Sequence, residues 1–145
     1  MSGELARWQR AGEPIVLVRH DSEEPGSPLA VGQPGNEFQD VVPPEADLLV
    51  TKEVHSAFHG EPDLAAWLCE RGIGEVAICG IQTNMCCETT ARVADDLGFG
   101  MTFVLDATHT FDLPGMSADE LARATAATLA ADFGRVVDTA TLLAA

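Results

Sequence analysis

The sequence predicts an α/β protein: a three-layer, Rossmann-like domain with a mostly parallel sheet and helices on both faces. Short apolar runs alternate along the chain with stretches that have helical spacing. This alternation is typical of βαβ units, in which crossover helices cover parallel strands. The runs are rich in Val and Ile, as strands buried on both faces require. The 145 residues suit one domain, and we expect a single domain over 1–145.

The strands are predicted from the continuous apolar runs. In chain order they cover residues 15–18, 47–53, 76–81, 101–105 and 136–138. Ligands of parallel α/β sheets bind at the carboxyl ends of the strands. That rule directs attention to the residues that follow each strand, which are Arg19-His20-Asp21, Lys52-Glu53, Gly80-Ile81-Gln82 and Asp106.

Helices are predicted between the strands. The first ends at Gly12 and the second at Gly72, because Gly commonly ends a helix. A capping box, Ser117 to Glu120, begins a later helix whose apolar stripe includes Leu121 and Leu129. The expected helices cover residues 4–11, 63–71, 83–97 and the segment that begins at 117, and residues 140–143 form a terminal turn. One face of the 83–97 helix is an apolar packing stripe at helical spacing, formed by Cys87, Ala91, Ala94 and Leu97. Residues 22–44 are rich in Gly, Pro and Glu without a period, so they form a long loop.

The composition restricts the partners and the compartment. Eight Lys and Arg residues face 23 Asp and Glu residues, for a formal net charge of −15. Such a surface repels nucleic acid and anionic membranes. The four cysteines, at 69, 79, 86 and 87, form neither a disulfide framework nor a CxxC pattern, and a reducing cytoplasm fits them best. No apolar run approaches the roughly 20 residues of a membrane helix.

The strongest local signal is the segment from Gly80 to Arg92. A buried strand ends at Gly80, the chain turns, Thr83 is the expected N-cap, and Cys86 falls in the first helical turn. Free backbone N–H groups and the helix dipole would stabilise a thiolate there. The same N–H groups could form an oxyanion hole. The alternative is a structural role, since Cys is also a common small core residue.

A second signal begins at Lys52, which ends an apolar strand in the sequence Lys-x-x-x-Ser-Ala-Phe. A lysine at a strand end is usually a solvated surface group. Close to Cys86, however, its positive charge would stabilise the thiolate and an anionic intermediate.

Taken together, these motifs resemble the isochorismatase-like cysteine hydrolases. The matching pattern is Gly-x-x-Thr-x-x-Cys-x-x-x-Thr-Ala from Gly80, preceded by the Lys52 motif. The resemblance runs from about Leu5 to Leu143, and residues 19–29 also resemble some members. It implies an enzyme, a cysteine hydrolase or amidase, that cleaves the C–N bond of a small-molecule amide through a thioester acyl-enzyme.

The resemblance also implies roles for individual residues. Cys86 is the expected nucleophile and Lys52 its electrostatic partner. The backbone N–H groups of Gln82 and Cys86 fall where the family builds its oxyanion hole, and the Ile81–Gln82 peptide falls where it carries a non-proline cis bond. We expect His20, Phe38 and Phe58 to line the substrate pocket.

The sequence departs from the family at the general base. The family's catalytic Asp ends an N-terminal strand, and nothing before Ile15 has that form. We therefore expect a domain that is N-terminally incomplete, with either an upstream extension, direct pairing of the flanking strands, or a strand from another chain. Asp21 is the possible substitute base. The alternative function is a non-catalytic relative that binds a ligand or a partner after loss of the base.

No metal or cofactor is expected, because His20, Asp21, His55 and His59 do not reproduce the metal-ligand spacing of some family members. Capping of turns is the expected role of Asp106 and His109. The family usually associates, which implies a homo-oligomer with contacts through the 83–97 helix and the loop after His109. The sequence does not identify the amide substrate.

Overall fold

The computed structural model describes residues 2–144, with side chains from 6 onward. The chain folds as two compact units that divide between Leu64 and Ala65, and each is described by itself. The helices and strands are α1 (Ser2–Arg10), β1 (Val16–His20), β2 (Leu48–Lys52), α2 (Leu64–Glu70), β3 (Glu75–Ile81), α3 (Glu88–Asp96), β4 (Gly100–His109), α4 (Ala118–Asp132), β5 (Arg135–Val137) and α5 (Thr139–Ala144).

All strand pairs are parallel, as predicted. They form a two-stranded sheet, β1–β2, and a three-stranded sheet with the order β3–β4–β5. No helix within these residues combines the length and apolar character that crossing a membrane requires.

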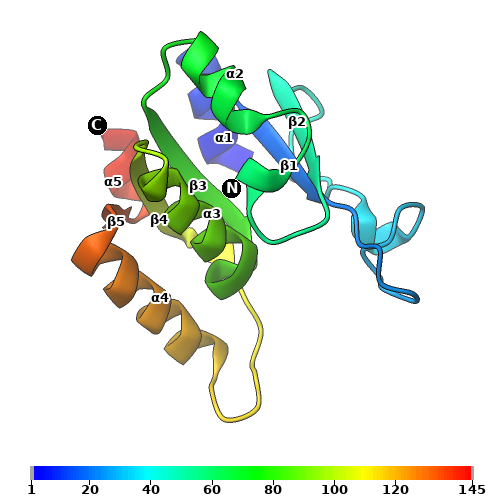
Figure 1. Ribbon diagram of the computed structural model, residues 1–145. Helices are drawn as coiled ribbons and strands as arrows, with labels where there is room; N and C mark the ends of the chain where they lie inside the picture. Colours follow the sequence, from blue (N-terminus) through cyan, green and yellow to red (C-terminus); the bar gives the residue numbers. More distant parts are fainter. Residues whose placement is uncertain (1, 145) are drawn as a thin grey trace. The chain divides into compact units, whose positions relative to one another are not determined.

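The first unit is built on β1 and β2. Their register runs from Val16 opposite Leu48 to His20 opposite Lys52, so both strands end side by side. The predicted long loop leaves the end of β1 and returns to β2, drawn in blue to cyan in Figure 1. Its one short helical turn is Pro34–Asn36.

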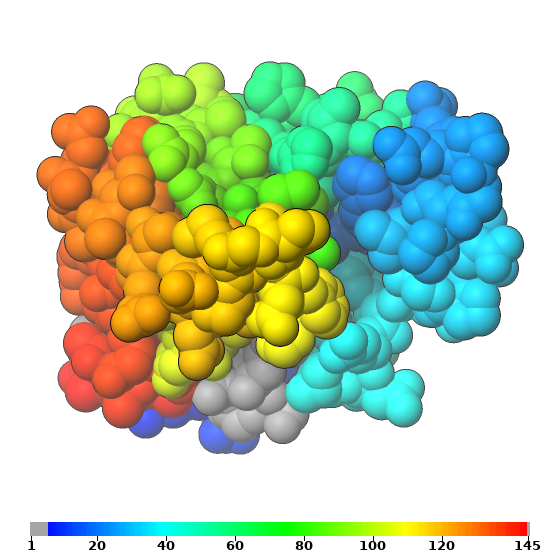
Figure 2. All heavy atoms as spheres, turned by 90° about the horizontal axis from the view of Figure 1, so that it is seen from below, coloured from blue at the N-terminus to red at the C-terminus, as the bar shows by residue number. Residues whose placement is uncertain are grey.

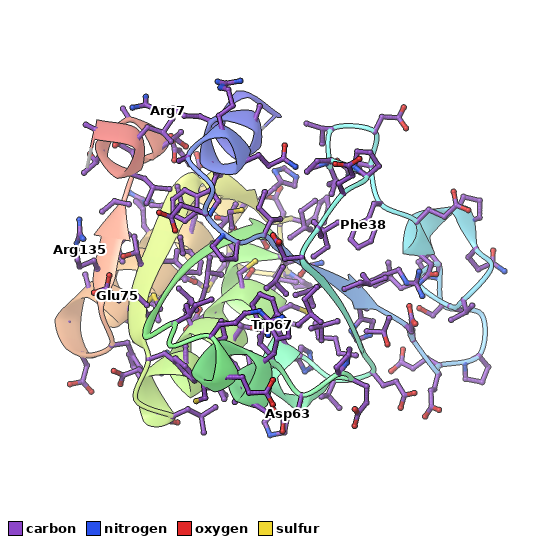
Figure 3. The ribbon with its side chains drawn as sticks, turned by 90° about the horizontal axis from the view of Figure 1, so that it is seen from above. Arg7, Phe38, Asp63, Trp67, Glu75 and Arg135 are labelled. Carbon is purple, nitrogen blue, oxygen red and sulfur yellow. The ribbon has the colours of Figure 1, made fainter. Side chains whose placement is uncertain are left out.

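In the second unit, helices lie on both faces of the β3–β4–β5 sheet, which confirms the predicted fold class. The views in Figures 1 and 3 place α3 and α4 on one face and α5 on the other. Phe103 on β4 and Leu129 on α4 are fully buried between these layers. On α3, the small side chains of Ala91 and Ala94 are also fully buried, which lets the helix pack closely.

The capping box of α4 is confirmed. The Ser117 hydroxyl accepts a hydrogen bond from the Glu120 backbone N–H, and the Glu120 carboxylate accepts one from the Ser117 N–H. The buried positions Leu121, Thr125 and Leu129 recur every four residues, as the predicted stripe requires.

Two strands differ from the prediction. Strand β4 continues to His109, because a bulge in the pairing brings Gly80 opposite Thr108 and Ile81 opposite His109. The expected burial of β3 on both faces is wrong: half-buried and exposed residues alternate along it, with Cys79 and Ile81 among the exposed ones. Within the described three-stranded sheet β3 pairs with β4 and is the edge strand.

Candidate active site

The end of β3 turns sharply toward the cysteine pair. Gly80 has a φ of +131°, a conformation that residues with a Cβ rarely adopt, which explains why Gly stands there. The Ile81–Gln82 peptide that follows is cis, as the family resemblance implied.

Residues Thr83–Cys87 form a single π-type turn that leads into α3. The predicted N-cap, Thr83, is wrong: Gln82 holds that position with φ −97° and ψ 146°. The Gln82 carbonyl accepts hydrogen bonds from the N–H groups of Met85 and Cys87, each 3.2 Å long. The Thr83 hydroxyl instead donates to Thr108 Oγ1 on β4, at 2.8 Å. The cap lies one residue early because Gln82 is the last extended residue of the strand.

The two adjacent cysteines have different surroundings. Cys86 is half-exposed in the first helical turn, so the alternative of a core cysteine does not describe it. Cys87 is buried and shares the packing stripe of Ala91 and Ala94, as predicted. Leu97, the expected last member of that stripe, is exposed, because the helix ends at Asp96.

A second contact joins this turn to Thr110, the residue that follows β4. The Thr110 hydroxyl donates a short hydrogen bond to the Asn84 side-chain oxygen, and Thr110 is buried. Neither residue stands out in the sequence, because they are 26 positions apart and no local pattern links them. Thr83 and Asn84 thus fasten the segment before Cys86 to Thr108 and Thr110 at the end of β4.

In the first unit, Lys52 is only 5% exposed, so the alternative of a solvated surface lysine does not describe it. Its Nζ lies 3.0 Å from His20 Nδ1 and donates to the Val54 carbonyl at 3.0 Å. Lys52 is the single lysine of the sequence, and the other seven of the eight Lys and Arg residues are arginines. A lone lysine at a strand end therefore already marks Lys52 as unusual in the sequence.

His20 ends β1 directly beside Lys52. Burial lowers the pKa of its imidazole, and electrostatic interaction with Lys52 and His55 lowers it further. The ring is therefore uncharged at neutral pH.

Asp21 follows His20 and is held by Arg19. The Arg19 guanidinium donates to both carboxylate oxygens, at 2.7 and 3.0 Å, with side-chain exposures of 31% for Arg19 and 17% for Asp21. The hydrogen bond from Arg19 lowers the pKa of the Asp21 carboxyl, and one from Asn36 lowers it further. A low pKa makes a carboxylate a weaker proton acceptor.

Asn36 is a functional candidate that sequence reasoning missed. It is buried, and its amide nitrogen donates to the His20 carbonyl at 2.9 Å, to Asp21 Oδ1 at 2.8 Å and to the Leu29 carbonyl at 3.2 Å. It thereby fastens the 22–44 loop to the end of β1. Its signal in the sequence is weak, since Asn is common in loops rich in Gly and Pro.

The two aromatic residues predicted for the pocket lie in the first unit. Phe38 is 37% exposed on the long loop, where Figure 3 labels it, and Phe58 is half-buried in the short turn after Lys52. Their role in a pocket stays a prediction. A separate open pocket of about 670 Å³ in this unit lies at the amino ends of the strands, where Arg10, Glu13 and Asp47 line it.

The remaining strand-end candidates are also placed. Asp106 caps α5, because its carboxylate accepts hydrogen bonds from Thr139 N and Oγ1 at 2.8 and 2.9 Å, which confirms the capping role. His109 makes an edge-to-face contact with Phe111. Residues 2–144 contain no group of three His, Cys, Asp or Glu side chains arranged to hold a metal ion.

The candidate residues thus fall into two sets. His20, Asp21 and Lys52 belong to the first unit, and Gln82 and Cys86 to the second. Each set stands at the carboxyl ends of strands in its own sheet, where ligands of α/β proteins bind. The convergence of Lys52 and Cys86 stays a prediction.

Comparison with known proteins identifies relatives over nearly the whole chain. The family model described as an isochorismatase domain matches residues 4–141. Nicotinamidase 3 of Arabidopsis thaliana is 33% identical over 144 residues, covering 90% of this chain and 69% of that protein. Streptothricin hydrolase of Streptomyces noursei is 34% identical, covering 77% of this chain but only 40% of that protein.

A solved structure supports the same grouping. A cysteine hydrolase from Pseudomonas syringae pv. phaseolicola superposes with a TM-score of 0.86 and 28% identity. The match covers 98% of this chain and 76% of that one. The 145 residues of this sequence thus span only part of the length of each of these three relatives.

Proposed function

Because the chain belongs to the isochorismatase family, we propose that it is a cysteine hydrolase that cleaves the C–N bond of a small-molecule amide. The observation that carries the proposal is the position of Cys86. It is half-exposed, in the first helical turn after a parallel strand, and its neighbour Cys87 is buried. A thiol at such a position is accessible to a substrate and close to the positive end of a helix.

The proposed chemistry is acyl transfer in two steps. The Cys86 thiol loses its proton and its sulfur bonds to the amide carbonyl carbon, giving a tetrahedral oxyanion. The C–N bond then breaks, the amine leaves with a proton, and a thioester remains. Water attacks the thioester, releases the acid and returns the thiol. The backbone N–H groups of Gln82 and Cys86 are the proposed donors to the oxyanion.

Lys52 is the proposed electrostatic partner of Cys86. Its burial at the end of β2 supports this role, since a charge removed from water acts more strongly on its surroundings than a solvated one. Charge neutralisation by the ammonium group would favour both the thiolate and the oxyanion. Lys52 is also the only lysine of the sequence, and it is buried rather than solvated, which supports a functional role for its charge.

Asp21 is the proposed substitute for the general base of the family. Against that role, both of its oxygens accept hydrogen bonds from Arg19, and its lowered pKa weakens it as a base. The same observation favours the second candidate function, a non-catalytic relative that binds a small molecule. In that case the fold and Cys86 persist without turnover.

The names of the relatives support an amide as the substrate class. One is a nicotinamidase and another a streptothricin hydrolase. The proposed substrate is accordingly a small amide.

The test is to trap the acyl-enzyme. The chain is incubated with a panel of small amides, quenched in acid, digested and analysed by mass spectrometry. A catalytic Cys86 gives a peptide that carries the acyl group of the substrate, together with released acid. Absence of both for every amide, with Cys86 still alkylated by iodoacetamide well below pH 8, would favour the ligand-binding alternative. A Cys86 that resists alkylation there would contradict an activated thiol altogether.

A further inference from the structure

His20 and Lys52 form a pair that the proposed reaction does not yet use. They lie directly opposite one another in the parallel register of β1 and β2. Their side-chain nitrogens are 3.0 Å apart, and Lys52 is almost completely buried. Such a distance between two nitrogens is a hydrogen bond, so one of them must accept.

The chemistry of the two groups decides which nitrogen accepts. An ammonium group carries three donors and no acceptor, and Lys52 Nζ already donates to the Val54 carbonyl. His20 Nδ1 must therefore accept through its lone pair. An imidazole that accepts at Nδ1 carries its single proton on Nε2 and has no net charge.

We propose that His20 is a positioning residue for Lys52: its uncharged ring, protonated on Nε2, holds the ammonium group through Nδ1, and protonation of the ring releases it. The inference rests on the proposed function, since it takes Lys52 as the cation of the site. It adds a specific reason for activity to fall in mild acid. A ring protonated at both nitrogens has no lone pair for Lys52, and it places a second positive charge beside the first.

The surroundings of the His20 ring set the balance between its uncharged and its protonated state. Burial and the electrostatic effects of Lys52 and His55 lower the pKa of His20, whereas the Val54 carbonyl and Asp21 raise it. The Val54 carbonyl is also the second acceptor for Lys52. A protonated ring thus competes with the ammonium group for that carbonyl as well as repelling it.

Asn36 steadies the histidine from the other side. Its amide donates to the His20 carbonyl at 2.9 Å, so the backbone beneath the ring is fixed by the 22–44 loop.

The first experiment reads the pair directly and needs no turnover. In the 145-residue chain at pH 7.5, ¹H–¹⁵N correlation spectra of the histidine rings should show His20 with Nε2 protonated and Nδ1 unprotonated. The His20→Asn variant assigns its signals among the four histidines. With ¹⁵N-lysine, a single side-chain ammonium signal reports Lys52. This Lys52 signal should shift or broaden as the pH falls, and the midpoint of its change should be the same pH as the midpoint of the His20 titration.

Two results would overturn the inference. One is a His20 ring protonated on Nδ1 at pH 7.5. The other is a Lys52 signal that does not change while His20 titrates.

The second experiment uses pH profiles of amide turnover. His20→Asn keeps an acceptor near the position of Nδ1 but cannot ionise, so the acid limb of its own pH profile should move to lower pH relative to that of the wild type. His20→Leu removes the acceptor and should lower kcat by roughly 10²-fold, the size of losing one positioned electrostatic group, with KM little changed. His59→Asn, at an exposed histidine, is the matched control and should leave the profile unchanged.

An acid limb that is the same in wild type and His20→Asn would contradict the inference. Thermal unfolding of each variant separates a loss of fold from a loss of positioning. If Cys86→Ala leaves turnover intact, the proposed function fails, while the spectra still decide whether His20 holds Lys52.

Discussion

The Thr83 hydroxyl donates a 2.8 Å hydrogen bond to Thr108 Oγ1, and this bond fastens the turn that carries Cys86 to the end of β4. Thr83 is 1% exposed, and Thr108 passes the interaction on by donating to the Leu105 carbonyl at 2.8 Å. The position of the proposed nucleophile therefore depends on a strand 25 residues away along the chain.

Replacing Thr83 should therefore affect both stability and catalysis. Thr83→Val keeps the shape of the side chain but removes the donor, so we expect a loss of about 1 kcal/mol in the free energy of unfolding. Turnover should fall further than the loss of folded protein explains. Thr128→Val, on the exposed side of α4, is the control and should change stability by less than about 0.5 kcal/mol. Urea unfolding and kcat measure the two effects; equal results for both variants would contradict the role of Thr83.

Gly80 should not tolerate a side chain. Its φ of +131° is costly for any residue with a Cβ, so Gly80→Ala is expected to cost about 1–3 kcal/mol. The added Cβ would lie 3.7 Å from Cys87 Sγ, an ordinary contact, so backbone strain rather than a clash is the cause. Gly74→Ala is the matched control, because no atom lies within 4 Å of its Cβ position. Thermal unfolding should show a clear loss for the first variant and little change for the second.

The two cysteines should differ in function. Cys86→Ala should reduce amide turnover to background, because it removes the proposed nucleophile. Cys87→Val should retain most turnover, because position 87 lies on the buried stripe and Val is close to Cys in volume. Rates of acid release, corrected for folded protein, provide the measurement. An equal loss in both variants would show that position 86 has no special role.

The ion pair of Asp21 with Arg19 should make stability depend on pH. Because the pKa of Asp21 is lowered in the folded state, its contribution is fully present above the unfolded value near 3.8 and is lost as the pH falls through the folded pKa. We expect Asp21→Asn to cost about 1 kcal/mol at pH 7, since the pair is partly exposed. The same variant should also show a smaller decrease in the free energy of unfolding, measured with urea, as the pH is lowered.

The control for this change is Asp40→Asn, at an exposed position of the same loop. It should leave the pH dependence of stability unchanged. Turnover of Asp21→Asn tests the other proposed role. If Asp21 is the general base, the variant should lose turnover completely. If the carboxylate is purely structural, turnover should fall only in proportion to the loss of folded protein.

The expected homo-oligomer has a candidate contact in the loop before α4. Phe111, Leu113 and Met116 are exposed there, on the segment drawn in yellow in Figure 2. Light scattering at micromolar concentration should give a multiple of 15.3 kDa, increasing with salt as the acidic charge is screened. Phe111→Ser should lower the mass, and Val31→Ser, at another exposed apolar residue, should not. A mass of one chain under all conditions would refute the prediction.

The sequence by itself determined the class of fold and the position of the cysteine turn. Strands and helices follow from patterns within a few residues, such as the capping box at Ser117 or the helix-ending Gly12. Local hydrogen bonds and backbone conformational preferences produce these features. The motif from Gly80 to Arg92 is equally local, so its turn and the burial of Cys87 could be anticipated, whereas its cis peptide was implied by the resemblance to the family.

Only the tertiary structure decided the surroundings of these motifs. The burial of Lys52 and its contact with His20, the fastening of the loop by Asn36, and the bond of Thr83 to Thr108 join residues 16 to 32 positions apart. A side chain reaches such partners only after the strands have paired, and their register sets which residues meet. The same reason accounts for the exposed positions of β3, whose apolar sequence does not state which neighbours cover it.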